Sequence, residues 1–90
     1  MKEFTYTVAD PNGLHARPAG LLVKEAQRLP DKVTLIKGGV AADLKKLLAV
    51  MGLGVRHMDT VTIRIEGAEE DASHRRLEAF LRDAFGVETE

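Results

Sequence analysis

Residues 10–18 read DPNGLHARP, and this stretch marks the point where a strand gives way to a helix. Pro11 fixes its own φ angle, and the Asn-Gly pair after it tolerates positive φ, which is the chemistry of a tight turn. Pro18 is compatible with a helix only in the first turn, so the helix is expected to begin near residue 16. His15 and Arg17 therefore lie at the start of this predicted helix.

The segments on either side of this stretch have matching periodicities. Residues 2–8 alternate polar and apolar, which predicts a half-buried strand with an inner face of Phe4, Tyr6 and Val8. After Pro18, apolar residues recur on one helical face, and Pro30 supports a helix end near Leu29. The members of that face are Ala19, Leu22, Val23, Ala26 and Leu29.

Two further helices are expected. Asp43 is a good N-cap for a short helix over residues 44–53. The last helix is expected over residues 69–85, and Gly86 can close it as a C-cap. Its predicted buried stripe consists of Leu77, Phe80, Leu81 and Ala84.

Three further strands complete the predicted fold, over residues 32–36, 40–42 and 60–66. The first two are joined by a Lys-Gly-Gly turn. The order is then β-α-β-β-α-β-α in one domain of residues 1–90. Since every strand alternates, one face of the sheet is expected to meet water. This is the pattern of an α/β (α+β) sandwich: four mainly antiparallel strands with helices packed on one face.

Composition excludes several classes of protein. No window has the roughly 18 consecutive apolar residues of a membrane span, and the alternating N-terminus is unlike a signal peptide; we expect a cytoplasmic location without membrane insertion. The net charge is −1, with three Phe, one Tyr and no Trp, which disfavours nucleic-acid binding. No ligand spacing or nucleotide loop is present, so no metal and no cofactor are expected. Nothing indicates an oligomer, and we expect a monomer.

His15 carries the main functional hypothesis. Helix N-termini present free N–H groups and a positive dipole end, and Arg17 adds a second positive charge, so imidazolium is disfavoured and a nucleophilic neutral imidazole is expected. The same surroundings suit an anion, held by the backbone N–H groups of Ala16 and Arg17 where Pro18 fixes the first turn. This combination points to phosphoryl transfer onto a histidine nitrogen. The alternative is a surface histidine in a turn, beside a solvated arginine.

The motifs PNGLHARPA at 11–19 and KKLLAVMGLGV at 45–55 resemble the HPr family, the small histidine phosphocarriers of the bacterial phosphoenolpyruvate:sugar phosphotransferase system. The resemblance implies an open-faced β-sandwich with strand order 1-4-2-3 and three helices on one face. It implies that His15 accepts a phosphoryl group at Nδ1 from phosphorylated enzyme I and passes it to enzyme IIA domains, with Arg17 steadying the group. Such a protein is a substrate of phosphotransferases and not itself an enzyme.

Two positions depart from the family pattern. Many Gram-positive relatives carry a regulatory serine where this chain has Lys46, and the single serine here is Ser73 in the last predicted helix. The resemblance therefore implies that control by serine phosphorylation is absent. Relatives often place a glycine near Met58, which would be strained at positive φ. We expect instead a differently built turn in which Asp59 takes part.

The second predicted helix has more apolar residues than one stripe can bury, which favours an exposed patch for a partner. The resemblance implies that Leu47, Leu48 and Met51 face partners, whereas Val50 and Leu53 point to the core. A shallow apolar platform is expected where these meet the outer face of the first helix, which carries Gly20, Leu21, Lys24 and Gln27. Its basic rim, able to steer acidic partners, would consist of Arg17, Lys24, Lys45 and Lys46. The alternative is that the leucines are core and the lysines merely solvated.

Other functions stay open at this point. A paralogue could serve a nitrogen-related or dihydroxyacetone-kinase relay, and a regulatory binding module could keep the fold without phosphotransfer. Members of the latter kind lack the histidine, which this chain has. His57 and His74 are expected to be ordinary surface residues.

Overall fold

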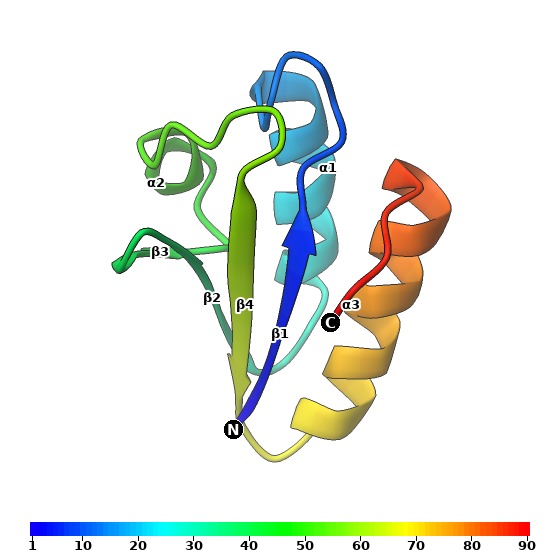
Figure 1. Cartoon of the computed structure of the whole chain (residues 1–90). Coiled ribbons are helices and arrows are strands. Elements are labelled where there is room, and N and C mark those ends of the chain that lie inside the picture. Colours follow the sequence, from blue (N-terminus) through cyan, green and yellow to red (C-terminus); the bar gives the residue numbers. More distant parts are fainter.

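The computed structural model describes all residues, 1–90, and contains seven elements (Figure 1). Their order, β-α-β-β-α-β-α, confirms the prediction. The elements are β1 (Lys2–Thr7), α1 (Ala16–Gln27), β2 (Lys32–Lys37), β3 (Val40–Asp43), α2 (Leu47–Met51), β4 (Thr60–Glu66) and α3 (Glu70–Phe85). None of the three helices combines the length and apolar character that crossing a membrane requires.

The four strands form one antiparallel sheet in the order β1-β4-β2-β3, as the family resemblance implied. β4 lies inside the sheet and pairs with both β1 and β2, so that Ile63 has Phe4 on one side and Leu35 on the other. All three of these side chains are buried. The strand with the clearest alternating pattern is therefore the one whose inner face meets the centre of the core.

The core lies between the sheet and the helices. Alternate strand residues point into it, and α1 and α3 contribute fully buried leucines, among them Leu22, Leu77 and Leu81. Figure 1 shows α1 and α3 running along the sheet, and the shorter α2 packs against α1. The inner faces predicted for β1 and α1 are confirmed: all eight of their apolar residues are buried, namely Phe4, Tyr6, Val8, Ala19, Leu22, Val23, Ala26 and Leu29.

The second helix differs from the prediction. It spans only Leu47–Met51, and Asp43 is the last residue of β3 and not the helix cap. The Asp43 carboxylate does accept a backbone N–H, but from Lys45 in the turn that follows the strand, at 2.9 Å. Because Asx turns and N-caps use the same side-chain-to-backbone hydrogen bond, the sequence pattern does not distinguish them. The residue at the N-cap is Lys46, in extended conformation and without a side-chain cap.

The last helix agrees with the prediction at its C-terminal end. Gly86 adopts the left-handed conformation, φ 65°, and its N–H donates to the carbonyl of Arg82. The predicted buried stripe is wrong at Ala84, which is exposed because this end of the helix extends past the sheet toward the loop before α1. The stripe instead begins at Ser73, which is buried near the start of α3.

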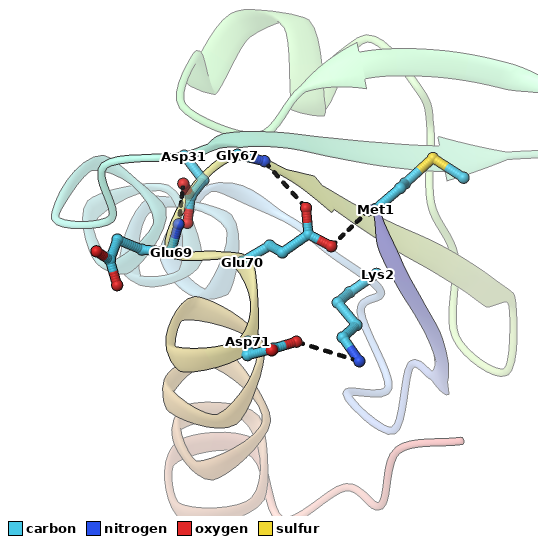
Figure 2. A network of polar contacts seen from close by, with 7 residues as sticks. All are labelled: Met1, Lys2, Asp31, Gly67, Glu69, Glu70 and Asp71. Atoms are coloured by element: carbon cyan, nitrogen blue, oxygen red, sulfur yellow. Dashed lines mark hydrogen bonds and ion pairs between the residues drawn. The ribbon is translucent and has the colours of Figure 1, made fainter.

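A buried aspartate from another part of the chain caps the start of α3. Asp31, which lies just before β2, accepts the backbone N–H of Glu69 at 3.1 Å and the hydroxyl of Ser73 at 2.7 Å. Figure 2 shows the contact between Asp31 and Glu69 beside a second one, in which the Glu70 carboxylate lies between the N–H of Gly67 and the N-terminal amine. The carboxylates at this end also complement the positive dipole end of the helix.

Met58 is the one residue other than glycine with a positive φ, 71°. The expectation that the turn avoids this conformation is wrong, although Asp59 does take part: its carboxylate accepts the Arg56 N–H at 2.8 Å. The backbone of Met58 is held in place because its N–H donates to the Val8 carbonyl at 2.8 Å. The tertiary contact with the segment that follows β1 thus outweighs the local preference of the side chain.

Replacing Met58 with glycine is expected to stabilise the protein by about 1 kcal/mol, which for a chain of this size raises Tm by about 4–8 °C. The left-handed strain disappears, and little packing is lost because the side chain is 64% exposed. Thermal unfolding measures the change. Met58→Ala is the matched control, since it removes the same side chain but keeps a Cβ. Equal stabilisation by both variants would show that strain is not the cause.

Candidate functional site

The loop before α1 is built around Asp10. Its carbonyl accepts the Gly13 N–H at 2.9 Å, and its carboxylate Oδ1 accepts the Asn12 N–H, also at 2.9 Å. These two bonds form the turn that the sequence predicted for residues 10–13. The turn directs the chain so that His15 enters α1 at the N-cap position.

A second loop, residues 52–59, holds this turn against the molecule. The Leu14 N–H donates to the Val55 carbonyl at 3.0 Å. Gly13 has φ 72°, and a Cβ there would lie 2.6 Å from the Val55 oxygen and 2.8 Å from the Arg56 Cα. Only glycine allows this approach, since both neighbours are backbone atoms. Figure 1 shows the two loops together at the end of the molecule where α1 begins.

The N-terminal end of α1 presents unpaired donors next to His15. His15 is the N-cap, with φ −81° and ψ −176°, and its side chain makes no capping hydrogen bond. The Ala19 N–H donates to the His15 carbonyl, and Pro18 has no N–H, so the backbone N–H groups of Ala16 and Arg17 are those left without a protein partner. The Arg17 guanidinium forms no ion pair and is exposed. The predicted helix start and the predicted donors are thus in one place.

Asp10 adds a charge that the sequence argument did not count. Its carboxylate Oδ2 lies 3.4 Å from His15 Nε2, and both side chains are about 40% exposed, at 40% for His15 and 39% for Asp10. The Asn12 N–H, and then His15, hold the pKa of Asp10 below its usual value. His15 thus has a carboxylate on one side in addition to the positive helix end and Arg17, so the charges around it are not uniformly positive.

A shallow hollow lies beside His15, and the C-terminal end of α3 forms part of its wall. Sequence reasoning did not place this helix end near His15, because no local pattern relates the two segments. The lining residues are Asp10, Asn12, His15, Arg17, Pro18, Leu21, Ala84 and Phe85. The hollow is open to solvent, and the Arg17 guanidinium lines it beside His15, so this side of the hollow could admit an anion.

The predicted docking surface is exposed on α1 and α2. Leu48 is the most exposed large apolar side chain of the protein, at 86%, while Val50 is buried and Leu53 packs against the core. The other exposed apolar members are Leu21, Leu47 and Met51. Gly20 has open space around its Cα, and Lys24 is exposed. The structure thus brings the predicted residues together on two helices that pack against each other.

Two of the polar residues expected on this surface also join elements of the fold. The Gln27 side chain donates to the Lys45 carbonyl at 2.9 Å, and the Lys45 ammonium donates to the Leu29 carbonyl at 2.7 Å. Lys45 is therefore partly occupied as a structural link between α1 and the segment before α2. Lys46 has no such partner and remains exposed.

The other two histidines differ from each other. His57 is an exposed loop residue whose Nδ1 lies 3.2 Å from the Asp10 carbonyl. His74 is not an ordinary surface residue: it stacks on Phe4, with ring centroids 4.8 Å apart, and its Nε2 lies 3.2 Å from Glu78 without hydrogen-bond alignment. No group of three or more histidine and carboxylate side chains is placed to hold a metal ion.

Asp59 stabilises the loop that supports the site, and this contribution is expected to depend on pH. The Arg56 N–H and the Lys37 ammonium, 3.2 Å away, hold the pKa of Asp59 below its usual value. A carboxyl with a lowered pKa stabilises the folded state above its unfolded pKa of about 3.9, and the contribution is lost as pH falls through the folded value. Asp59→Asn is therefore expected to destabilise at pH 7 but not near pH 2.

Urea unfolding of wild type and Asp59→Asn at several pH values measures this difference. The asparagine oxygen can still accept the Arg56 N–H, so the comparison isolates the charge. Asp83→Asn, an exposed carboxyl on α3, is the control and is expected to run parallel to wild type. A constant gap between wild type and Asp59→Asn down to pH 2 would contradict the prediction.

The comparisons with known proteins agree with this geometry. Residues 2–83 match the family model described as the PTS HPr component phosphorylation site. The chain belongs to the HPr family. A phosphocarrier protein HPr from Mycoplasma genitalium is 38% identical, over 90% of this chain and 93% of the relative. Members of the HPr family are phosphocarriers and not catalysts, and this chain is one of them.

Two further relatives extend the comparison. The crystal structure of an HPr from Thermoanaerobacter tengcongensis superimposes with a TM-score of 0.86 at 31% identity, covering 96% of this chain and 97% of the other. A multiphosphoryl transfer protein of Xanthomonas campestris is 35% identical over 89% of this chain, which corresponds to 10% of that longer protein. The HPr fold therefore occurs among these relatives both alone and within a larger phosphotransfer protein.

Proposed function

We propose that this HPr-family chain accepts a phosphoryl group on His15 from phosphorylated enzyme I and donates it to enzyme IIA domains during sugar uptake. It would act in the cytoplasm as a monomer. The observation that carries the proposal is the half-exposed imidazole at the N-cap of α1, beside two unpaired backbone N–H groups and a free guanidinium.

Each part of the site has a role in this chemistry. The His15 Nδ1 lone pair is the nucleophile, and the N–H groups of Ala16 and Arg17 can donate to the oxygens of the bound phosphoryl group. Pro18 sets the backbone of the first turn without adding a donor. The Arg17 guanidinium supplies charge-assisted hydrogen bonds, each contributing about 1.5–3 kcal/mol where water is partly excluded.

The docking surface would bring partners over His15. Leu21, Leu47, Leu48 and Met51 provide exposed apolar area around the small Gly20, with Gln27 at its edge. Arg17, Lys24 and Lys46 at the rim would attract acidic partner surfaces and raise the association rate. Since Lys46 occupies the N-cap of α2, control by phosphorylation of a serine at that place is not available to this chain.

Incubation with enzyme I and labelled phosphoenolpyruvate tests the proposal. The expected product is one phosphoryl group per chain that is labile in acid and stable in alkali, and that is assigned to His15 Nδ1 by phosphorus and nitrogen NMR. Adding an enzyme IIA domain is expected to discharge it. No label, or an acid-stable ester, would overturn the proposal. A sugar-system enzyme I and a nitrogen-system enzyme I, used in parallel, identify the branch that the protein serves.

A further inference from the structure

The Asp10 residue is held through both its carboxylate and its backbone carbonyl. Its Oδ1 accepts the Asn12 N–H at 2.9 Å, and its Oδ2 lies 3.4 Å from His15 Nε2. The Asp10 carbonyl accepts the Gly13 N–H at 2.9 Å and lies 3.2 Å from His57 Nδ1. A side chain held in this way presents an acceptor to one particular nitrogen of the imidazole.

The nitrogen that faces a carboxylate carries the proton in a neutral imidazole, and the other nitrogen then holds the lone pair. We propose that Asp10 is a positioning residue that keeps the His15 proton on Nε2, so that Nδ1 is free to accept the phosphoryl group. This inference rests on the proposed function, and it adds to that function the group that selects the reacting nitrogen.

The transfer step balances with this assignment. The Nδ1 lone pair forms the N–P bond while the bond from phosphorus to the donor atom breaks, and its electron pair leaves with the donor. Nε2 keeps its proton throughout, and the ring gains positive charge as the N–P bond forms. The Asp10 carboxylate lies next to that charge and stabilises it, as the carboxylate of a hydrolase triad does for its histidine. The return step to an acceptor reverses these changes.

The charged groups that face His15 differ in what they stabilise. Arg17 and the N-terminal end of α1 favour a phosphoryl anion beside His15, whereas Asp10 favours a proton on Nε2. The His57 Nδ1 lies 3.2 Å from the backbone carbonyl of Asp10. Because the side chains of His15 and Asp10 are both about 40% exposed, solvent weakens the contact. The expected effect on rate is therefore moderate.

Asp10→Asn is the main variant. Its amide oxygen can still accept the Asn12 N–H, so the turn is preserved, but its NH2 group then faces His15 and donates where the carboxylate accepted. Asp10→Glu restores the carboxylate one methylene further out. Asp71→Asn is the matched control, an exposed carboxyl at the start of α3 and at the opposite end of the molecule from His15 (Figure 1).

Two readouts test the inference. Nitrogen NMR of the unphosphorylated proteins is expected to show the Nε2–H tautomer in wild type, in Asp71→Asn and largely in Asp10→Glu, and a shift toward Nδ1–H in Asp10→Asn. The phosphorylation rate by enzyme I is expected to fall about threefold to tenfold in Asp10→Asn and to recover at least partly in Asp10→Glu. Thermal unfolding confirms that each variant is folded.

The outcomes separate this inference from the proposed function. If wild type accepts no phosphoryl group, the proposed function fails, whereas the tautomer measurement still tests the Asp10 contact. If wild type is phosphorylated and Asp10→Asn matches it in tautomer and rate, the inference is overturned while the function stands. A rate loss without a change of tautomer would also overturn it, because Asp10 would then act through something other than proton placement.

Discussion

Replacing His15 with alanine is expected to abolish phosphoryl acceptance from enzyme I, leaving no label above background. The physical reason is that no other nucleophile shares its surroundings. His57 is exposed in a loop, and His74 stacks on Phe4 against Glu78. Neither lies at a helix N-terminus, so neither has backbone N–H groups placed to receive the incoming anion.

The His15→Ala variant is expected to fold normally, which makes the result interpretable. The His15 side chain makes no capping hydrogen bond, and neither histidine nor alanine is a favoured N-cap, so the helix loses little. Circular dichroism and thermal unfolding check this expectation. His74→Gln is the control and is expected to keep wild-type labelling within about twofold, since it leaves the α1 end untouched. Label on His15→Ala would place the acceptor elsewhere and contradict the assignment.

Replacing Gly67 with alanine is expected to give the largest loss of stability, about 3 kcal/mol or more, from two physical causes. Gly67 has φ 154°, a conformation that costs other residues about 1–3 kcal/mol. A Cβ there would also lie 2.1 Å from Asp31 Oδ1. The carboxylate must then move, which leaves the buried Ser73 hydroxyl and the Glu69 N–H without their acceptor, at a further cost of about 1–3 kcal/mol.

Thermal and urea unfolding measure this effect, and the expected fall in Tm is about 12 °C or more. Gly38→Ala is the matched control: it also has a positive φ, 55°, but a Cβ there meets nothing within 4 Å, so only the backbone cost of about 1 kcal/mol remains. A cycle with Asp31→Ala separates the two causes. If the clash with the carboxylate matters, the double variant is less destabilised than the sum of the single variants. Additive losses would restrict the effect to backbone strain.

The Gly67→Ala variant is expected to lose stability without losing phosphoryl acceptance. The start of α3 and the His15 site lie at opposite ends of the molecule (Figure 1), so labelling of Gly67→Ala at low temperature is expected to match wild type. The hydrogen bonds of Asp31 with Glu69 and Ser73 are therefore expected to contribute to stability and not to phosphoryl acceptance. No sequence pattern pointed to this network, because Asp31 and Ser73 are 42 residues apart and meet only in the folded protein.

The sequence by itself determined the elements and the chemistry of the motif. Period-two and helical apolar spacing identified the strands and the long helices, since burying one face requires that spacing in any fold. Pro18 located the start of α1, because proline is excluded from later turns. That predicted helix start also gave the positions of His15, Arg17 and the free backbone N–H groups at the N-terminal end of the helix.

The tertiary structure decided what depends on contacts between distant segments. Helix α2 begins at Leu47 and not at residue 44 as predicted, because Asp43 is the last residue of β3. Met58 keeps a left-handed conformation, since its N–H donates to the carbonyl of Val8, directly after β1. Asp10 lies close to His15 because of the local turn that the Asn12 N–H closes, and a count of nearby positive charges alone overlooked this carboxylate. The start of α2 and the conformation of Met58 depend instead on strand pairing and on hydrogen bonds between segments far apart in the chain, which form only once the chain has folded.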